Sequence, residues 1–106
     1  MKMAVAEITI IPIGTKGPSL SKYVSGAIEE LEKLNLEYEL TPSGTVIEGE
    51  LEEILEATRK MHESVFDDEI KRVVTSLEID DRRDKKLSLS GKKKSVTDRL
   101  EGKESD

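Results

Sequence analysis

The sequence contains no cysteine and a single histidine, and aromatic residues make up only 3% of its 106 residues. Without cysteine the chain can form no disulfide, thiolate metal site, thiol nucleophile or iron–sulfur cluster. One histidine excludes a multi-histidine metal site. No apolar run approaches the roughly 18 residues that a membrane-spanning helix needs. We therefore expect a protein without resident metal or cofactor that does not insert into a membrane.

A chain of this length suits one domain with a modest core. Charged residues reach 38%, but isoleucine, leucine and valine recur in periodic blocks, which disordered chains lack. Near the N-terminus, Glu7 interrupts the apolar residues too early for a secretion signal. We expect a soluble, cytoplasmic protein with one domain over residues 1–100 and a disordered tail over residues 101–106.

The charges are unevenly distributed along the chain. Residues 1–81 hold 8 basic and 18 acidic residues, a net charge of −10, whereas residues 82–106 hold 9 basic and 5 acidic residues, a net charge of +4. The total of −6 argues against nucleic-acid binding, which needs a basic surface. The basic C-terminal segment is expected either to stay solvated or to dock on the acidic body of its own or a neighbouring chain.

Alternation of apolar and polar residues predicts four strands. They are expected at residues 3–11, 36–41, 45–49 and 71–79. Pro12 and Gly14 are expected to end the first strand, and residues 42–44 to form the turn of a hairpin.

Apolar residues spaced by three and four positions predict two helices. The first is expected over residues 20–34 with Ser19 as its N-cap, and the second begins near Glu50. Their apolar stripes are Leu20, Tyr23, Val24, Ala27, Ile28, Leu31 and Leu34, then Leu51, Ile54, Leu55, Thr58, Met61, His62 and Val65. A weaker third helix is predicted over residues 92–101.

The element order β-α-β-β-α-β indicates an α+β fold of the ferredoxin-like type, with a four-stranded antiparallel sheet and two helices on one face. The other face is left open. Its expected apolar members are Val5, Ile11, Val46 and Val74, which a purely solvated face would not need. Glu7 and Glu48 share this face, and Arg72 or a cationic ligand is expected to partner them. The open face or the edge strands are therefore expected to form a subunit interface or a shallow ligand site.

Four short segments carry a resemblance to a known family. Residues 8–15 read ITIIPIGT, residues 42–49 PSGTVIEG, residues 72–75 RVVT and residues 81–84 DRRD. The second segment, Pro-x-Gly-Thr-x-x-Glu-Gly between a hairpin and a helix, is the most specific. With these segments the chain resembles the MTH1187/YkoF-like thiamine-binding protein family over residues 3–100.

The resemblance implies a homo-oligomer, a tetramer made of two dimers, that binds thiamine or its hydroxymethylpyrimidine moiety without transforming it. A carrier, storage or sensing role follows. The resemblance implies ligand-binding residues at Glu7, Thr9, Thr45, Glu48, Arg72 and Thr75, and the chemistry of the ligand adds Tyr38 and Ser43. Carboxylates can accept a hydrogen bond from the exocyclic amine of the pyrimidine, hydroxyls can add directional bonds, and an aromatic or aliphatic wall can cover the ring.

Two other classes of function remain open. The first is a regulatory or structural oligomer, similar to ACT domains, that senses another small metabolite for a partner enzyme. The second is an enzyme, although no acid–base pair, activated nucleophile or metal constellation stands out. A lone histidine such as His62 on an apolar helix face is expected to be structural. Glu48 facing solvent or paired with Arg72 is the simplest alternative to ligand contact.

Overall fold

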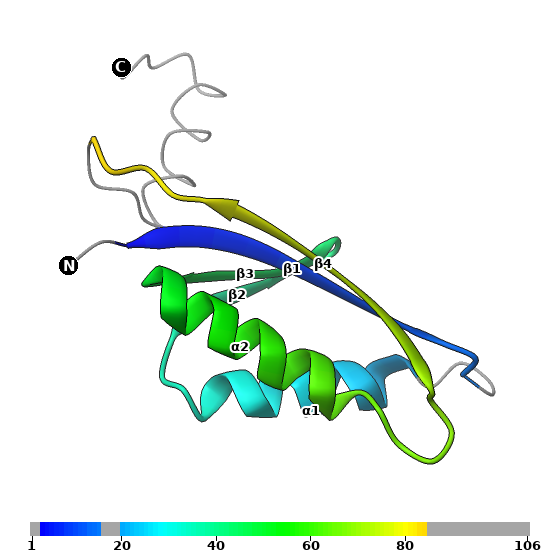
Figure 1. Cartoon of the computed structure of the whole chain (residues 1–106). Coiled ribbons are helices and arrows are strands. Elements are labelled where there is room, and N and C mark those ends of the chain that lie inside the picture. The colour runs from blue at the N-terminus through cyan, green and yellow to red at the C-terminus, as the bar shows by residue number, and fades with distance from the viewer. Residues whose placement is uncertain (1–2, 16–19, 85–106) are drawn as a thin grey trace.

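The computed structural model describes residues 3–15 and 20–84. Its elements are β1 (Ala4–Ile13), α1 (Leu20–Glu32), β2 (Glu37–Thr41), β3 (Gly44–Gly49), α2 (Leu51–Ser64) and β4 (Arg72–Asp80). The strands form one antiparallel sheet in the order β2-β3-β1-β4. Both helices lie on the same face of that sheet (Figure 1). The predicted ferredoxin-like fold is confirmed.

Some predictions lie outside the described residues. These are the N-cap at Ser19, the helix over residues 92–101 and the tail over residues 101–106. Within the part that the structure describes, no helix is long and apolar enough to cross a membrane.

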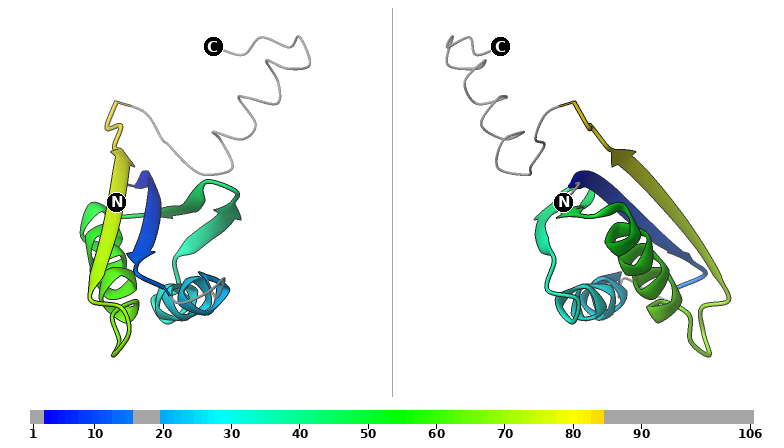
Figure 2. Two further views of the ribbon diagram at one scale, coloured as in Figure 1. Left: turned by 90° about the vertical axis from the view of Figure 1, so that its right-hand side faces the viewer. Right: turned by 60° about the vertical axis from the view of Figure 1, so that its left-hand side comes forward.

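The core lies between the sheet and the helices, and Figure 2 shows these two layers from two further sides. Ile8 and Ile47 reach it from the sheet, Leu31 from α1, and Ile54 and Met61 from α2. Each of these side chains is at most 2% exposed. Burial of an apolar side chain of this size contributes about 1.5–3 kcal/mol, so this layer is the main source of stability.

Helix α2 begins where the sequence predicts. The carboxylate of Glu53 accepts a 2.9 Å hydrogen bond from the N–H of Glu50, as in a capping box. The buried residues of α2 are Ile54, Ala57 and Met61. Leu55, predicted on the apolar stripe, is 48% exposed, so its assignment to the packed face is wrong. The reason is geometric, because neighbouring residues lie about 100° apart around a helix and Ile54 already points into the core.

Strand β1 runs through Pro12 to Ile13, so the predicted end at Pro12 is wrong. Pro12 lies opposite Val73 of β4. On its other side β1 pairs with β3 only from Ala4 to Ile8. The last residues of β1 therefore border one strand only, and proline is tolerated where one side of a strand needs no N–H donor.

Candidate functional site

A cavity of about 390 Å³ opens between α1 and the sheet, beside the turn that joins β2 to β3. It forms because the hairpin is shorter than its neighbours. Strands β2 and β3 have 5 and 6 residues, whereas β1 and β4 have 10 and 9. In Figure 1, β1 and β4 continue past the hairpin over the N-terminal half of α1. The volume falls in the range of roughly 300–1,000 Å³ that is typical of small-molecule sites.

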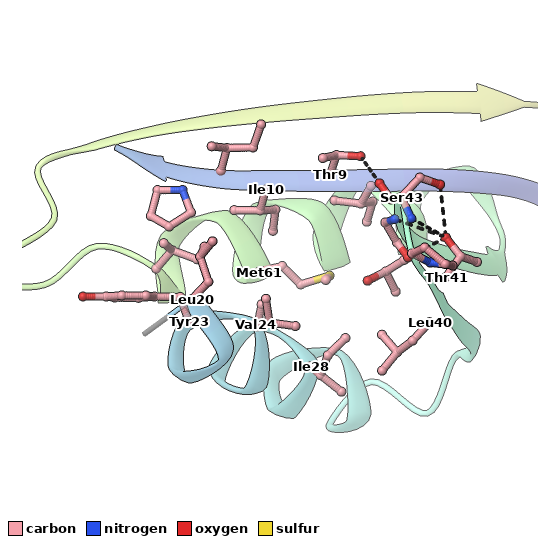
Figure 3. A pocket seen from close by; sticks show the side chains of 18 residues that line it. Thr9, Ile10, Leu20, Tyr23, Val24, Ile28, Leu40, Thr41, Ser43 and Met61 are labelled. Carbon is pink, nitrogen blue, oxygen red and sulfur yellow. Dashed lines mark hydrogen bonds between the residues drawn. The ribbon is translucent and has the colours of Figure 1, made fainter. Parts of the chain in front are cut away.

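The walls of the cavity are mostly apolar. Figure 3 shows Val24 and Ile28 of α1 pointing toward Ile10 of β1, with Met61 of α2 also on the wall. Leu20 and Val24 belong to the predicted apolar stripe, yet they are 50% and 46% exposed. They line the cavity instead of packing in the core. Apolar side chains that remain partly exposed in a hollow are suited to cover an apolar ligand surface.

One end of the cavity is closed by a polar turn. The Thr41 hydroxyl accepts hydrogen bonds from the N–H groups of Ser43 (3.3 Å) and Gly44 (3.1 Å), and it donates to the Gly44 carbonyl (3.0 Å). Ser43 is also joined to β1 (Figure 3). The Thr9 hydroxyl donates to the Ser43 carbonyl at 3.1 Å, and the Ser43 hydroxyl donates to the Glu7 carboxylate at 3.3 Å. These bonds hold the hydroxyl groups of the turn in place.

Glycine is required where this turn meets β1. A Cβ atom on Gly44 would lie 2.8 Å from the carbonyl oxygen of Ile8 and 3.0 Å from Oγ1 of Thr9. The first of these is a backbone atom, so a side chain could be admitted only by moving the turn. The close approach of turn and strand thus depends on Gly44.

Thr45 places a hydroxyl on the inner wall of the cavity. The residue lies opposite Ile8 in the sheet and is 7% exposed. Its hydroxyl forms no hydrogen bond with any residue that the structure describes. No fully enclosed side-chain N or O atom in that part of the chain lacks a partner, so the Thr45 hydroxyl is not fully enclosed, and the residue itself lines the cavity. It is available to donate to a ligand or to accept from one.

Tyr23 lies at the end of the cavity opposite the turn (Figure 3). Its hydroxyl donates a 3.4 Å hydrogen bond to Glu69. Burial, followed by the nearby carboxylates of Asp67 and Glu69, raises the pKa of the Tyr23 phenol, which therefore stays protonated. The Lys22 ammonium lies 5.4 Å from the ring centroid, within cation–π distance. These contacts hold the aromatic ring at the wall.

The structure brings half of the predicted site residues together. Thr9, Ser43 and Thr45 line the cavity, and Glu7 is joined to it through the Ser43 hydroxyl. All four surround the turn between β2 and β3, which is the most specific segment of the sequence resemblance.

The other four predicted site residues do not line the cavity. Tyr38 packs against the core on the helix side of the sheet. The Thr75 hydroxyl lies 2.6 Å from Nδ1 of His62, which agrees with a structural role for this histidine. Glu48 and Arg72 lie on the open face, where the alternation of β3 and β4 places them.

The predicted pairing of Arg72 with Glu7 or Glu48 is wrong. The antiparallel register sets Arg72 opposite Ile13 and sets Glu7 opposite Glu78. Six residues along a strand span about 20 Å, so Arg72 lies far from both carboxylates. Neither Glu7 nor Glu48 has an ion-pair partner among the described residues.

Sequence reasoning missed the helix side of the cavity. Tyr23 and Ile28 are buried, as the predicted apolar stripe requires, but together with Val24 they also line the cavity. The sequence predicts Tyr38 as the aromatic residue that covers a ligand ring, whereas the aromatic residue that lines the cavity is Tyr23. The available signal was the difference in strand length, because a short hairpin beside a long strand leaves part of a helix uncovered.

The cavity suits non-covalent binding of a small molecule. Its apolar walls can cover a ring, and its hydroxyls at one end can orient polar ring substituents. Across residues 3–15 and 20–84, no group of three or more histidine, aspartate or glutamate side chains could hold a metal ion.

Comparison with known proteins places the chain in a family. It is 46% identical over 99 residues to a UPF0045 protein of Methanothermobacter thermautotrophicus, covering 92% of this chain and 100% of that one. Among solved structures it is similar to MJ1052 of Methanocaldococcus jannaschii, with a TM-score of 0.83, 47% identity and coverage of 92% and 98%. It is also similar to TM0486 of Thermotoga maritima, a protein provisionally assigned to thiamine biosynthesis or salvage, with a TM-score of 0.75, 26% identity and coverage of 89% and 98%. The family model described as thiamine-binding protein matches residues 6–97, and the chain therefore belongs to this thiamine-binding protein family.

Proposed function

We propose that the cavity between α1 and the sheet binds thiamine or its hydroxymethylpyrimidine moiety, and that the protein carries, stores or senses this ligand without chemical conversion. The observation that carries the proposal is the cavity itself, with apolar walls, a polar turn at one end and Thr45 among the residues that line it. Membership of the thiamine-binding family supports the choice of ligand.

The chemistry of the ligand matches the order of groups along the cavity. An aminopyrimidine has an exocyclic amine that donates and ring nitrogens that accept. The turn offers an acceptor in the Ser43 hydroxyl, which donates its own proton to Glu7 on the open face of the sheet, and Thr45 offers a donor. Tyr23 and the aliphatic side chains of α1 can cover the ring face. In this proposal Tyr38, Glu48, Arg72 and Thr75 make no contact with the ligand.

We further propose a homo-oligomer, a tetramer of two dimers, located in the cytoplasm. Among the described residues, strand β4 is an edge strand of 9 residues with β1 on one side only, and unpaired edges of this length favour pairing with another chain. Ile11, Ile13 and Val74 are exposed together on the open face, which adds an apolar surface for a second contact.

The ligand proposal is tested by calorimetric titration of the full chain with thiamine, hydroxymethylpyrimidine and a panel of amino acids. The variant Thr45→Val keeps the shape of the side chain and removes the hydroxyl. We expect it to weaken binding by about 1 kcal/mol, roughly fivefold, which is the usual contribution of one hydrogen bond.

Thr58→Val is the matched control, because the Thr58 hydroxyl donates to the Ile54 carbonyl within α2, outside the cavity. The affinity of this variant for thiamine or the pyrimidine should equal that of the unmodified chain. If neither thiamine nor the pyrimidine bound at high micromolar concentration, the proposal would be rejected. Binding of an amino acid instead would favour a regulatory oligomer.

A further inference from the structure

The open face of the sheet has an acidic half next to the point where the chain leaves β4. The alternation and register of the strands put six carboxylates there. They are Glu7, Glu37, Glu39, Glu48, Glu78 and Asp80. Glu7 lies directly opposite Glu78, and Glu37 lies directly opposite Glu48. Like charges directly opposite each other destabilise a sheet, so this arrangement calls for a cationic partner.

The described residues supply no such partner for the opposed pairs. No ion pair to Glu7, Glu37, Glu48 or Glu78 occurs among residues 3–15 and 20–84. Arg72, at the far end of β4, is the one basic residue that the described strands place on this face.

The arginines that follow β4 are already paired. Arg82 lies 2.6 Å from a carboxylate oxygen of Asp84, and Arg83 lies 2.9 Å from one of Asp81. Each pairs with a carboxylate two positions away, and Arg82 also interacts electrostatically with Asp80 of the acidic half, but neither forms an ion pair with the opposed glutamates.

The next ten residues have the required charge. Residues 85–94 read KKLSLSGKKK, with five lysines and no acidic residue. Two leucines, Leu87 and Leu89, lie between the lysines. On the acidic half of the face, Val5 and Val46 lie among the carboxylates, so the segment matches the surface in charge and in apolar content.

Position and length also match. Strand β4 ends at Asp80, opposite Val5, which is the acidic end of the sheet. Residues 81–84 separate the strand end from this segment and lead at most about 13 Å away from it, and ten extended residues reach about 33 Å. Returning over that distance and crossing three strand spacings, about 14 Å, needs about 27 Å. The segment can therefore cross all four strands without leaving its own chain.

A second copy packed face to face is a poor occupant of the acidic half, because it would bring Glu7, Glu37, Glu48 and Glu78 of two chains together, and none of these four has an ion pair among the described residues. We therefore propose that the acidic half of the open face is the docking surface of the basic segment, residues 85–94, of the same chain. The apolar half around Ile11 and Val74 is then left for contact between copies.

The test attaches a spin label to the full chain through Ser90→Cys, which creates the only thiol. The spin label broadens the NMR signals of amides that lie close to it. If the segment docks, the amide signals of Val46, Glu48 and Glu78 should lose more than half of their intensity. Signals of Arg59 and Glu63, on the exposed side of α2, should keep theirs. Uniform broadening, or none on the sheet, would overturn the proposal.

A mixed sample decides whether the contact is within one chain. Isotope-labelled chain without the spin label is combined with unlabelled chain that carries it. The sheet signals should stay sharp in this sample, and broadening of Val46 and Glu48 there would overturn docking within the same chain.

Charge variants that carry the spin label test whether the lysine charges hold the segment on the sheet. Replacing Lys92, Lys93 and Lys94 by glutamine should remove the sheet broadening. The control replaces Lys22, Lys60 and Lys71 by glutamine. It makes the same change in net charge, and the broadening of the sheet signals should remain. If the first variant failed to fold, raising the salt concentration with the native lysines should reduce the broadening, because it screens exposed charges. If neither the lysine substitutions nor the higher salt concentration changed the broadening, docking by charge attraction would be overturned. All samples lack ligand, so the result is independent of the proposed function.

Discussion

At the scale of single residues, glycines that look alike in the sequence have opposite roles. A Cβ atom on Gly44 would lie 2.8 Å from the carbonyl oxygen of Ile8, whereas a Cβ atom on Gly26, inside α1, would meet nothing within 4 Å. The first glycine is required by close approach, and the second only adds flexibility to a helix.

Alanine substitution separates these two roles. Gly44→Ala should lower the free energy of unfolding by about 1–3 kcal/mol, the usual cost of overpacking, and should also weaken ligand binding because the turn must move. Gly26→Ala should raise the free energy of unfolding by about 0.5–1 kcal/mol. Urea denaturation measures both, and equal effects would contradict the steric role of Gly44.

At the scale of elements, the loop between α2 and β4 is held by one carboxylate. Asp67 accepts hydrogen bonds from the N–H groups of Ile70 at 2.7 Å and Glu69 at 2.9 Å. The bond from Ile70 is the largest cause that lowers the pKa of Asp67 below its ordinary value of 3.8. The folded chain therefore stabilises the ionised carboxylate of Asp67 more than the unfolded chain does.

This linkage predicts the direction of a pH effect. A lowered pKa contributes stability that is present above the unfolded value, near 3.8, and is lost as the pH falls through the folded value. Asp67→Asn should therefore reduce the loss of stability below about pH 4, measured by urea denaturation across the acid range. The control is Asp68→Asn, one position along, whose side chain forms no hydrogen bond with the described residues. An unchanged acid profile for Asp67→Asn would refute the linkage.

At the scale of the whole molecule, the sheet has two surfaces open to other chains. The edge of β4 has no neighbouring strand among the described residues, and Val74 lies 41% exposed beside Ile11 on the open face. These features are the basis for the proposed oligomer.

A charge placed in the apolar half should disrupt that assembly. Val74→Arg should shift the chain toward smaller species in sedimentation velocity, because an unpaired charge in an apolar contact is costly. The control Leu55→Arg places the same charge on the exposed side of α2, and it should leave the sedimentation profile unchanged. If Val74→Arg sedimented like the unmodified chain, this part of the face would not be an interface.

The local patterns were sufficient to predict most of the fold. Alternation predicted the strands and placed Ile8 and Ile47 in the core, and spacings of three and four residues predicted both helices. The same rules failed at Leu55 and Pro12. The exposure of Leu55 depends on which helix face meets the sheet, and the continuation of β1 through Pro12 depends on which strands flank it.

The sequence by itself determined the order of elements, the alternation of faces and the residue types of the turn between β2 and β3, because each depends on neighbours a few positions away. The tertiary structure alone decided that Thr9, Ser43, Thr45 and Tyr23 surround one cavity and that Arg72 lies far from Glu7. Strand register and the relative lengths of hairpin and neighbouring strands set those distances, and both arise from contacts between segments that are remote in the chain.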